Sequence, residues 1–158
     1  MAGTAERPNA VPWPPIILIL SIVVGALLGI YVPIGWPGGE GADILQGAGV
    51  VVILVAVGLG IAALYTLRKS NTTFRGDRAA DHLVTNGPFA MTRNPIYLSN
   101  VILLIGLGLF FGNGWLLIAA IVSGYADGKL AIEREEAHLD TRFGKPWREY
   151  RKRVRRWI

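Results

Sequence analysis

Long apolar stretches separated by short polar ones dominate the chain. The first runs from about residue 15 to 34 and the second from about residue 44 to 67. Each contains about 20 residues, enough for a helix to cross a hydrocarbon core of roughly 30 Å. The pattern predicts two transmembrane helices in the first half of the chain. A cleaved signal peptide fits the first stretch less well, because no small-x-small cleavage site follows it.

A second pair of apolar stretches covers residues 96–111 and about 115–126. Only residues 112–114, Gly-Asn-Gly, separate them, and so short a connection predicts a hairpin of two antiparallel helices. The fourth stretch is short, so we expect its helix to continue past Asp127 towards water. A carboxylate that faces lipid is costly. We therefore expect Asp127 at the membrane interface or in the bundle interior.

The basic residues indicate the orientation of these helices. Of the 16 Lys and Arg residues, one precedes the first stretch, five lie between the second and third, and ten follow the fourth. Residues 35–43 and 112–114 contain none. Cytoplasmic loops carry an excess of Lys and Arg, so both termini are predicted to be cytoplasmic, and we expect a multi-pass protein of a prokaryotic inner membrane. The same distribution explains the net charge of +5 without nucleic acid as a partner.

Composition supports the membrane class and excludes some chemistry. The chain is 52% hydrophobic and 17% charged, outside the usual soluble range. It has no cysteine, which excludes disulfides and cysteine nucleophiles. Its two histidines, His82 and His138, are far apart, so no metal site is expected. Gly25 and Gly29 form a GxxxG pattern typical of close helix packing, within one chain or between two.

The region between and after the apolar stretches is larger than a plain anchor needs. Residues 85–88, Thr-Asn-Gly-Pro, are a strong turn signal, and Pro95 suits the first turn of a helix. We expect an all-α integral membrane bundle of four transmembrane helices with cytoplasmic C-terminal helices. The single domain, 1–158, would comprise two helices in 1–67, a cytoplasmic connection in 68–95, the hairpin in 96–128 and the C-terminal helices in 129–158.

Two helices are predicted after residue 129. In the first, Ile132, Leu139 and Phe143 recur at helical spacing, and Gly144 is the expected C-terminal cap. The second begins near Pro146, and its apolar positions are Trp147, Tyr150 and Val154. Its opposite face is densely basic, which is typical of a helix that lies on the membrane surface or closes over the bundle.

Two motifs in this region resemble one known family. GPFAMTRNPIYL begins at Gly87, and EREEAHLDTRFGKPWREYRKRVRRWI begins at Glu133. With the hydrophobic hairpin between them, they resemble the isoprenylcysteine carboxyl methyltransferases and the related membrane phospholipid methyltransferases. The resemblance covers about residues 87–157 and is specific, because five separate elements occur in order and at compatible spacing.

The resemblance implies an integral membrane enzyme that uses S-adenosylmethionine, releases S-adenosylhomocysteine and takes a hydrophobic acceptor from the bilayer. By position, Arg93 and Glu136 would be the catalytic residues. The residues expected around the cytoplasmic cofactor pocket are Gly87, Pro88, Asn94, Pro95, Tyr97, Leu98, Glu135, Glu136, Leu139, Phe143, Trp147 and Tyr150.

Methyl transfer from a sulfonium requires mainly that two reactants are positioned and water is excluded. Arg93 could pair with the cofactor carboxylate or orient a substrate carboxylate, because its planar donor fork suits that group. Glu135 or Glu136 could bind the amino group or ribose of the cofactor. An amine acceptor must also lose a proton, and Glu136 is the candidate acceptor of that proton.

The sequence departs from the family pattern at three positions, and it leaves the acceptor open. Asn94 replaces a His, and Phe89 and Trp147 each replace a Tyr. Asn cannot accept a proton near neutral pH, so a mechanism that needs a base there is in doubt. The acceptor could be a prenylcysteine-like carboxylate, a phospholipid amine or another lipophilic nucleophile. A non-catalytic membrane scaffold is the alternative function, and the oligomeric state is open.

Overall fold

The computed structural model describes residues 11–70 and 83–158, and within these ranges it contains helices and no strand. This confirms the all-α prediction. Arg7, Arg75, Arg78 and His82 lie outside the described residues. The elements are α1 (Trp13–Tyr31), α2 (Glu40–Lys69), the 3-10 helix η2 (Gly87–Ala90), α3 (Pro95–Phe111), α4 (Gly114–Asp127), the π-helical segment η3 (Gly128–Ile132), α5 (Glu133–Phe143) and α6 (Lys145–Arg153).

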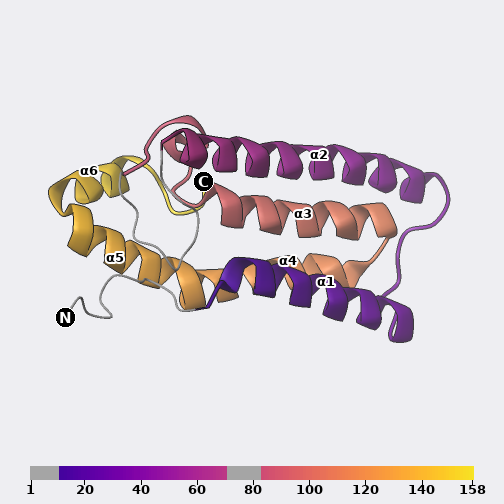
Figure 1. The fold of residues 1–158 in the computed structure, drawn as a ribbon. Helices are drawn as coiled ribbons and strands as arrows, with labels where there is room; N and C mark the ends of the chain where they lie inside the picture. Colours follow the sequence, from indigo (N-terminus) through magenta and orange to yellow (C-terminus); the bar gives the residue numbers. More distant parts are fainter. Residues whose placement is uncertain (1–10, 71–82) are drawn as a thin grey trace.

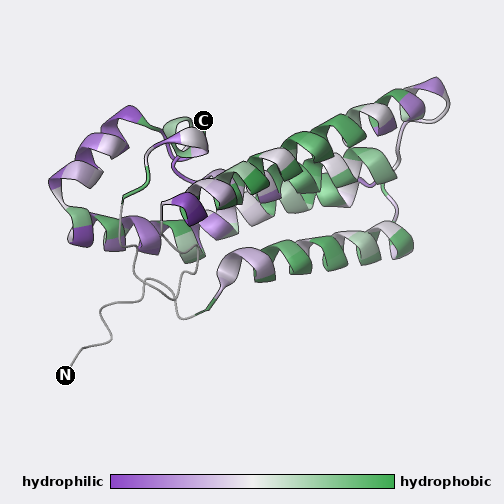
Figure 2. Ribbon diagram, turned by 45° about the horizontal axis from the view of Figure 1, so that its top comes forward, coloured by the Kyte–Doolittle hydropathy of each residue, from purple (hydrophilic) through white to green (hydrophobic). Residues whose placement is uncertain are grey.

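The helix lengths are those of an integral membrane protein. Within the described ranges, three helical stretches are long and apolar enough to cross a membrane: α1, α2 and the continuous stretch Gly114–Phe143. The fourth apolar helix, α3, is shorter, with 17 residues. Hydrophobic residues dominate α1 to α4, whereas α5 and α6 are largely hydrophilic (Figure 2). The crossing of the membrane by α3 remains a prediction.

The helices pack in an order different from their order in the chain. α1 lies along α4, α4 along α3, and α3 along α2 (Figure 1). The predicted tight hairpin joins α3 to α4. Gly112 ends α3 in the left-handed conformation, with φ of 63°, which glycine adopts without strain. Asn113 then caps α4, because its Oδ1 accepts a hydrogen bond from the Trp115 backbone N–H at 3.0 Å.

Small residues allow these helices to approach closely. A Cβ on Gly25 would lie 2.6 Å from Leu116 Cδ2, so the first glycine of the GxxxG pattern packs against α4 of the same chain. Gly29 faces Asn113 in the same way. Between α2 and α3, a Cβ on Gly49 would lie 2.5 Å from the backbone nitrogen of Phe110. The pattern therefore serves packing within one chain.

The fourth helix continues past Asp127, as predicted, and it joins the first of the two helices predicted after residue 129. α4, η3 and α5 form one continuous helix from Gly114 to Phe143. Gly128 does not interrupt it and is the first residue of the wider, π-helical segment η3. α6 begins after Gly144, the predicted cap, and ends at Arg153, so Val154 lies outside it. His138 is half-buried.

The polar elements gather at one end of the bundle. α5, α6 and the C-terminus lie at the end opposite the hairpin turn, beside the start of α3 (Figure 1). η2 packs against α2. The fold therefore brings both sequence motifs to the same end.

Candidate active site

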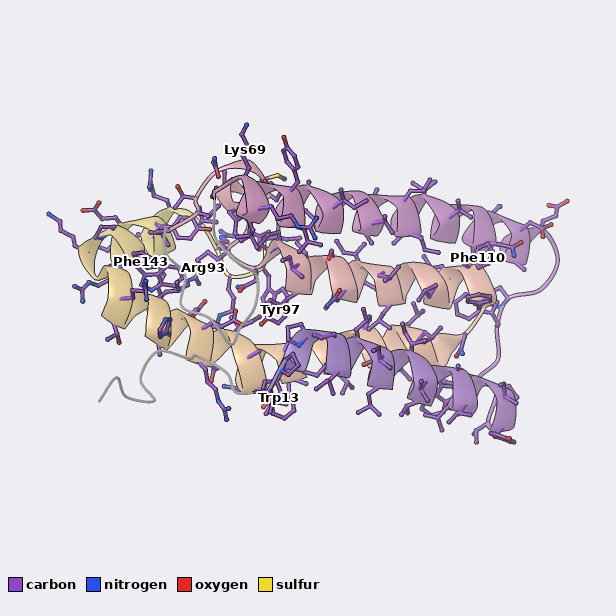
Figure 3. All side chains as sticks on the ribbon, in the orientation of Figure 1. Trp13, Lys69, Arg93, Tyr97, Phe110 and Phe143 are labelled. Atoms are coloured by element: carbon purple, nitrogen blue, oxygen red, sulfur yellow. The ribbon has the colours of Figure 1, made fainter. Side chains whose placement is uncertain are left out.

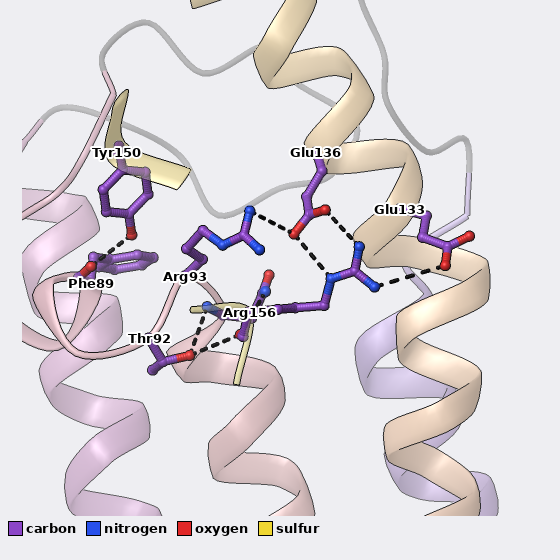
Figure 4. Close-up of polar contacts among 8 residues, drawn as sticks. Phe89, Thr92, Arg93, Glu133, Glu136, Tyr150 and Arg156 are labelled. Atoms are coloured by element: carbon purple, nitrogen blue, oxygen red, sulfur yellow. Dashed lines mark hydrogen bonds and ion pairs between the residues drawn. The ribbon is translucent and has the colours of Figure 1, made fainter. Parts of the chain in front are cut away.

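Glu136 of α5 lies between two arginines from other parts of the chain (Figure 4). Its Oε1 accepts a hydrogen bond from Nε of Arg156 at 3.1 Å, and its Oε2 accepts one from Nη2 at 2.7 Å. Nη1 of Arg93 lies 3.2 Å from Oε1. The side chains of Glu136 and Arg93 are each only 9% exposed. Such a bidentate guanidinium pair is among the stronger charge-assisted contacts.

The C-terminal segment is held against the start of α3 by its backbone. The Arg93 backbone N–H donates to the Arg155 carbonyl oxygen at 3.0 Å. The Thr92 hydroxyl and Asn94 Nδ2 both donate to the Arg156 carbonyl oxygen, each at 3.0 Å. These bonds fix the backbone from which the Arg156 side chain reaches Glu136. Arg156 and Thr92 were not among the residues predicted from the sequence.

Two aromatic residues of α6 form the wall beside Arg93. Trp147 and Tyr150 are buried, with ring centroids 5.7 Å apart. The Arg93 guanidinium lies 5.6 Å from the Trp147 ring centroid, a cation–π arrangement. The Tyr150 hydroxyl donates to the Phe89 carbonyl oxygen at 2.6 Å. Burial raises the pKa of Tyr150 to about 12, so its hydroxyl stays protonated near neutral pH.

A second carboxylate of α5, that of Glu135, has a different partner. The Tyr97 hydroxyl donates to Glu135 Oε1 at 2.7 Å, and the Tyr97 ring packs against Ala131 and Ile132. Figure 3 labels Tyr97 and Arg93 near the start of α3. Asp127 ends α4 in the same region, and only 1% of it is exposed. The adjacent glutamates of α5 thus have different partners: Glu136 contacts arginines, and Glu135 contacts a tyrosine.

The remaining predicted residues occupy several positions. Asn94 and Pro95 are buried at the start of α3. Gly87 and Pro88 belong to η2, where Gly87 has φ of 57° and a Cβ would lie 2.9 Å from Thr66 Oγ1 of α2. Gly87 therefore has a packing role that needs no cofactor. The residues that are half-buried are Leu98, Leu139 and Phe143.

The site contains buried donors without acceptors. Nε and Nη1 of Arg93 and Nε1 of Trp147 are buried and make no hydrogen bond to the described residues. Nη1 of Arg93 is within ion-pair distance of Glu136 but is not aligned as a hydrogen bond. Burial lowers the pKa of Arg93, and hydrogen bonding to Glu136 raises that of Arg156. Such donors can bind an anion or another acceptor.

Within residues 11–70 and 83–158, no group of three or more His, Cys, Asp or Glu side chains could hold a metal ion.

Comparisons with known proteins support the family that the two motifs resemble. The profile of the phospholipid methyltransferase family matches residues 45–146. An uncharacterised protein of Haemophilus influenzae is 33% identical over 63 residues, which are 40% of this chain and 100% of that protein. The nickel-cobalt-cadmium resistance protein NccN of Alcaligenes xylosoxydans xylosoxydans is 31% identical over 103 residues, 64% of this chain and 47% of that protein. The match to this chain thus spans about half of NccN.

The family match covers more than half of the chain and includes part of the site, but Trp147 and Tyr150 of α6 lie beyond its end. It contains most of α2, the whole hairpin, α5, and both Arg93 and Glu136. Arg156 lies beyond its end. The chain belongs to the phospholipid methyltransferase family.

Proposed function

We propose that this chain transfers a methyl group from S-adenosylmethionine to a lipophilic acceptor. Family membership supports methyl transfer at a membrane. The observation that carries the proposal is Arg93, a buried cation at the edge of the membrane domain whose Nε and Nη1 lack hydrogen-bond acceptors among the described residues. A buried donor without an acceptor is costly, so a ligand that supplies one is expected.

The chemistry of these donors fits one end of the cofactor. The amino-acid portion of S-adenosylmethionine ends in a carboxylate, which would accept from Arg93. Trp147 Nε1 is a second buried donor without a partner in the described part of the chain. Bound there, the cofactor would supply a methyl group on a positively charged sulfur. Arg93 would orient it, and the aromatic wall of Trp147 and Tyr150 would exclude water.

Glu136 would act as a positioning residue. Both of its oxygens contact guanidinium groups, so it must give up an ion-pair contact to accept a proton. We propose that it holds Arg93 and Arg156 in place. Glu135, which already accepts from Tyr97, is the candidate for contact with the cofactor ribose or amino group.

The proposed site and both ends of the chain would be cytoplasmic, in a prokaryotic inner membrane. In the described residues, basic side chains concentrate at the end of the bundle with α5 and α6, and the α1–α2 and α3–α4 connections contain none. Cytoplasmic regions next to membrane helices are enriched in Lys and Arg. Methyl acceptors in the bilayer would approach this end from the lipid.

Binding and transfer measurements test the proposal together. The detergent-solubilised protein should bind S-adenosylhomocysteine in a calorimetric titration. It should also transfer labelled methyl from S-adenosylmethionine to a lipid extract. Arg93→Ala should weaken binding at least about tenfold, since a charge-assisted hydrogen bond contributes about 1.5–3 kcal/mol. Lys152→Ala, an exposed change on α6, is the control. Binding without transfer to any lipid would favour the non-catalytic scaffold, and no binding would overturn the proposal.

A further inference from the structure

A cavity of about 420 Å³ lies at the hairpin end of the bundle, opposite α5 and α6 (Figure 1). Its walls come from α1 and the residues that follow it, from α3, and from the hairpin turn with the start of α4. The side chains that line it include Ile22, Ala26, Ile30, Leu107, Phe111 and Leu116. Ile30 and Phe111 are 71% and 67% exposed, so the cavity opens at the surface of the bundle. Its volume lies within the range of about 300–1,000 Å³ that is usual for ligand sites.

The packing of α1 explains why this cavity exists. Gly25 brings α1 close to Leu116 of α4. Two hydrogen bonds then hold α1 to the hairpin: Asn113 Nδ2 donates to the Gly25 carbonyl oxygen at 2.9 Å, and Trp115 Nε1 donates to the Val32 carbonyl oxygen at 2.6 Å. Because α1 is held against α4 in this way, it cannot move towards α3 to close the cavity without losing these contacts.

The lining of the cavity suits a hydrocarbon chain. Among the described residues that line it, none is charged, and Asn113 alone has a polar side chain. The amide of Asn113 is already used, because its Nδ2 donates to Gly25 and its Oδ1 accepts from the Trp115 backbone N–H. A polar ligand would lose its hydrogen bonds to water and would gain none from these side chains, which is unfavourable. An apolar ligand has no such cost.

The cavity extends over the depth that the lipid tails of one leaflet occupy. Ile22, Ala26 and Ile30 are spaced four residues apart, so they share one face of α1 over about 12 Å. One leaflet contributes about half of a hydrocarbon core of roughly 30 Å. Trp36 packs on Gly112 at the hairpin turn, and tryptophan is enriched where a membrane meets water. The mouth of the cavity therefore lies near the membrane interface, and its far end lies among the lipid tails.

We propose that this cavity binds one hydrocarbon chain of a membrane phospholipid. An empty cavity would leave Leu107 and Leu116 without contacts on one side and forfeit their dispersion attraction. α1 is long and apolar enough to cross a membrane, so lipid tails surround its exposed face and are available to fill the space. The described basic residues lie at the other end of the bundle, so binding depends on the chain and not on the charge of the headgroup. The site is separate from the candidate active site.

Native mass spectrometry with two phospholipids tests this assignment. The protein is purified in glyco-diosgenin, a detergent with a rigid steroid body in place of a flexible chain, and titrated with palmitoyl-oleoyl phosphatidylcholine or palmitoyl-oleoyl phosphatidylglycerol. We expect saturable binding of one lipid per chain with the same Kd for both headgroups. Ala26→Phe fills the cavity and should raise Kd about tenfold or more, because each methylene group that is excluded weakens binding about fourfold. Ala48→Phe, an exposed change on α2 outside the lining, is the control.

Thermal unfolding in the same detergent gives a second readout. Either lipid should raise the Tm of the wild-type protein and of Ala48→Phe, and should leave that of Ala26→Phe unchanged. If Ala26→Phe has a lower Tm than the wild type without lipid, the smaller change Ala26→Leu takes its place in both measurements.

Three results would overturn the inference. The first is equal lipid binding by the wild-type protein and the cavity-filling variant. The second is clearly tighter binding of phosphatidylglycerol, which would assign the lipid to the basic end of the bundle. The third is a dimer without lipid that Ala26→Phe dissociates, which would show that a second copy of the chain covers the cavity. Methyl transfer takes no part in these measurements, so none of these results bears on the proposed function.

Discussion

The Arg156 guanidinium binds both carboxylate oxygens of Glu136, at 3.1 and 2.7 Å. The two residues come from different elements, since Glu136 lies on α5 and Arg156 follows α6. The contact therefore closes the C-terminal segment over the candidate site. It also means that the last few residues of the chain contribute directly to the structure of that site.

Removal of this contact should destabilise the protein. Arg156→Ala leaves the mostly buried Glu136 with Arg93 as its remaining arginine contact, and loss of a hydrogen-bonded charged partner costs about 1–3 kcal/mol. We expect Tm in detergent to fall by roughly 2–4 °C per kcal/mol. The matched control is Arg155→Ala, because the side chain of Arg155 is exposed and only its carbonyl oxygen bonds to Arg93. Equal Tm values for the two variants would contradict the role given to Arg156.

Asn94 should tolerate substitution only where the new side chain can donate. Its Nδ2 donates to the Arg156 carbonyl oxygen, so Asn94→Asp places an acceptor against an acceptor at a buried position. We expect Asn94→Asp to lower the free energy of unfolding by about 1–3 kcal/mol. Asn94→His restores the family residue and a ring N–H, so it should cost less. Chemical denaturation measures both, and a more stable Asp variant would refute this explanation of Asn94.

Close packing between α2 and α3 gives a third prediction. Gly49→Ala would place Cβ 2.5 Å from the backbone nitrogen of Phe110, and backbone cannot move aside easily. We expect a loss of about 1–3 kcal/mol from this overpacking. A Cβ on Gly47, on the same helix, meets no atom within 4 Å. Gly47→Ala should therefore leave Tm unchanged or raise it, because alanine favours helix. Similar effects of the two changes would show that α2 and α3 do not pack as described.

The absence of cysteine makes the proposed orientation testable without background labelling. Single cysteines can be introduced by Gly38→Cys, before α2, and by Lys152→Cys, on α6; both positions are exposed. In intact cells, a membrane-impermeant maleimide should label the first variant and not the second. Permeabilised cells should label both equally. Labelling of Lys152→Cys in intact cells would reverse the proposed topology.

Local chemistry made much of the fold predictable. The three residues between the third and fourth apolar stretches correctly predicted a hairpin, in which Gly112 caps the end of α3 and Asn113 caps the start of α4. The cost of a carboxylate in lipid correctly indicated that Asp127 would lie at the interface or inside the bundle, and it is buried. The helical spacing of Ile132, Leu139 and Phe143 correctly predicted a helix, in which Ile132 ends η3 and the other two belong to α5.

Tertiary contacts between distant segments were not predictable. Arg156 is one of many basic residues near the C-terminus, and the sequence pattern does not distinguish it from its exposed basic neighbours. Its position depends on the turn after α6 and on backbone bonds to Thr92 and Asn94. The sequence therefore could not explain why Asn stands at position 94. In the structure its side-chain amide donates a hydrogen bond to the Arg156 carbonyl oxygen, 62 residues away. The site residues taken from the family resemblance remain proposals.

The most direct measurement is a calorimetric titration of the purified wild-type protein with S-adenosylhomocysteine, repeated for Arg93→Ala and Lys152→Ala. We predict saturable binding of one molecule per chain by the wild-type protein and by Lys152→Ala. Arg93→Ala should bind at least about tenfold more weakly. Equal binding by all three proteins would contradict the role of Arg93. Absence of binding to the folded wild-type protein would contradict the proposed use of S-adenosylmethionine.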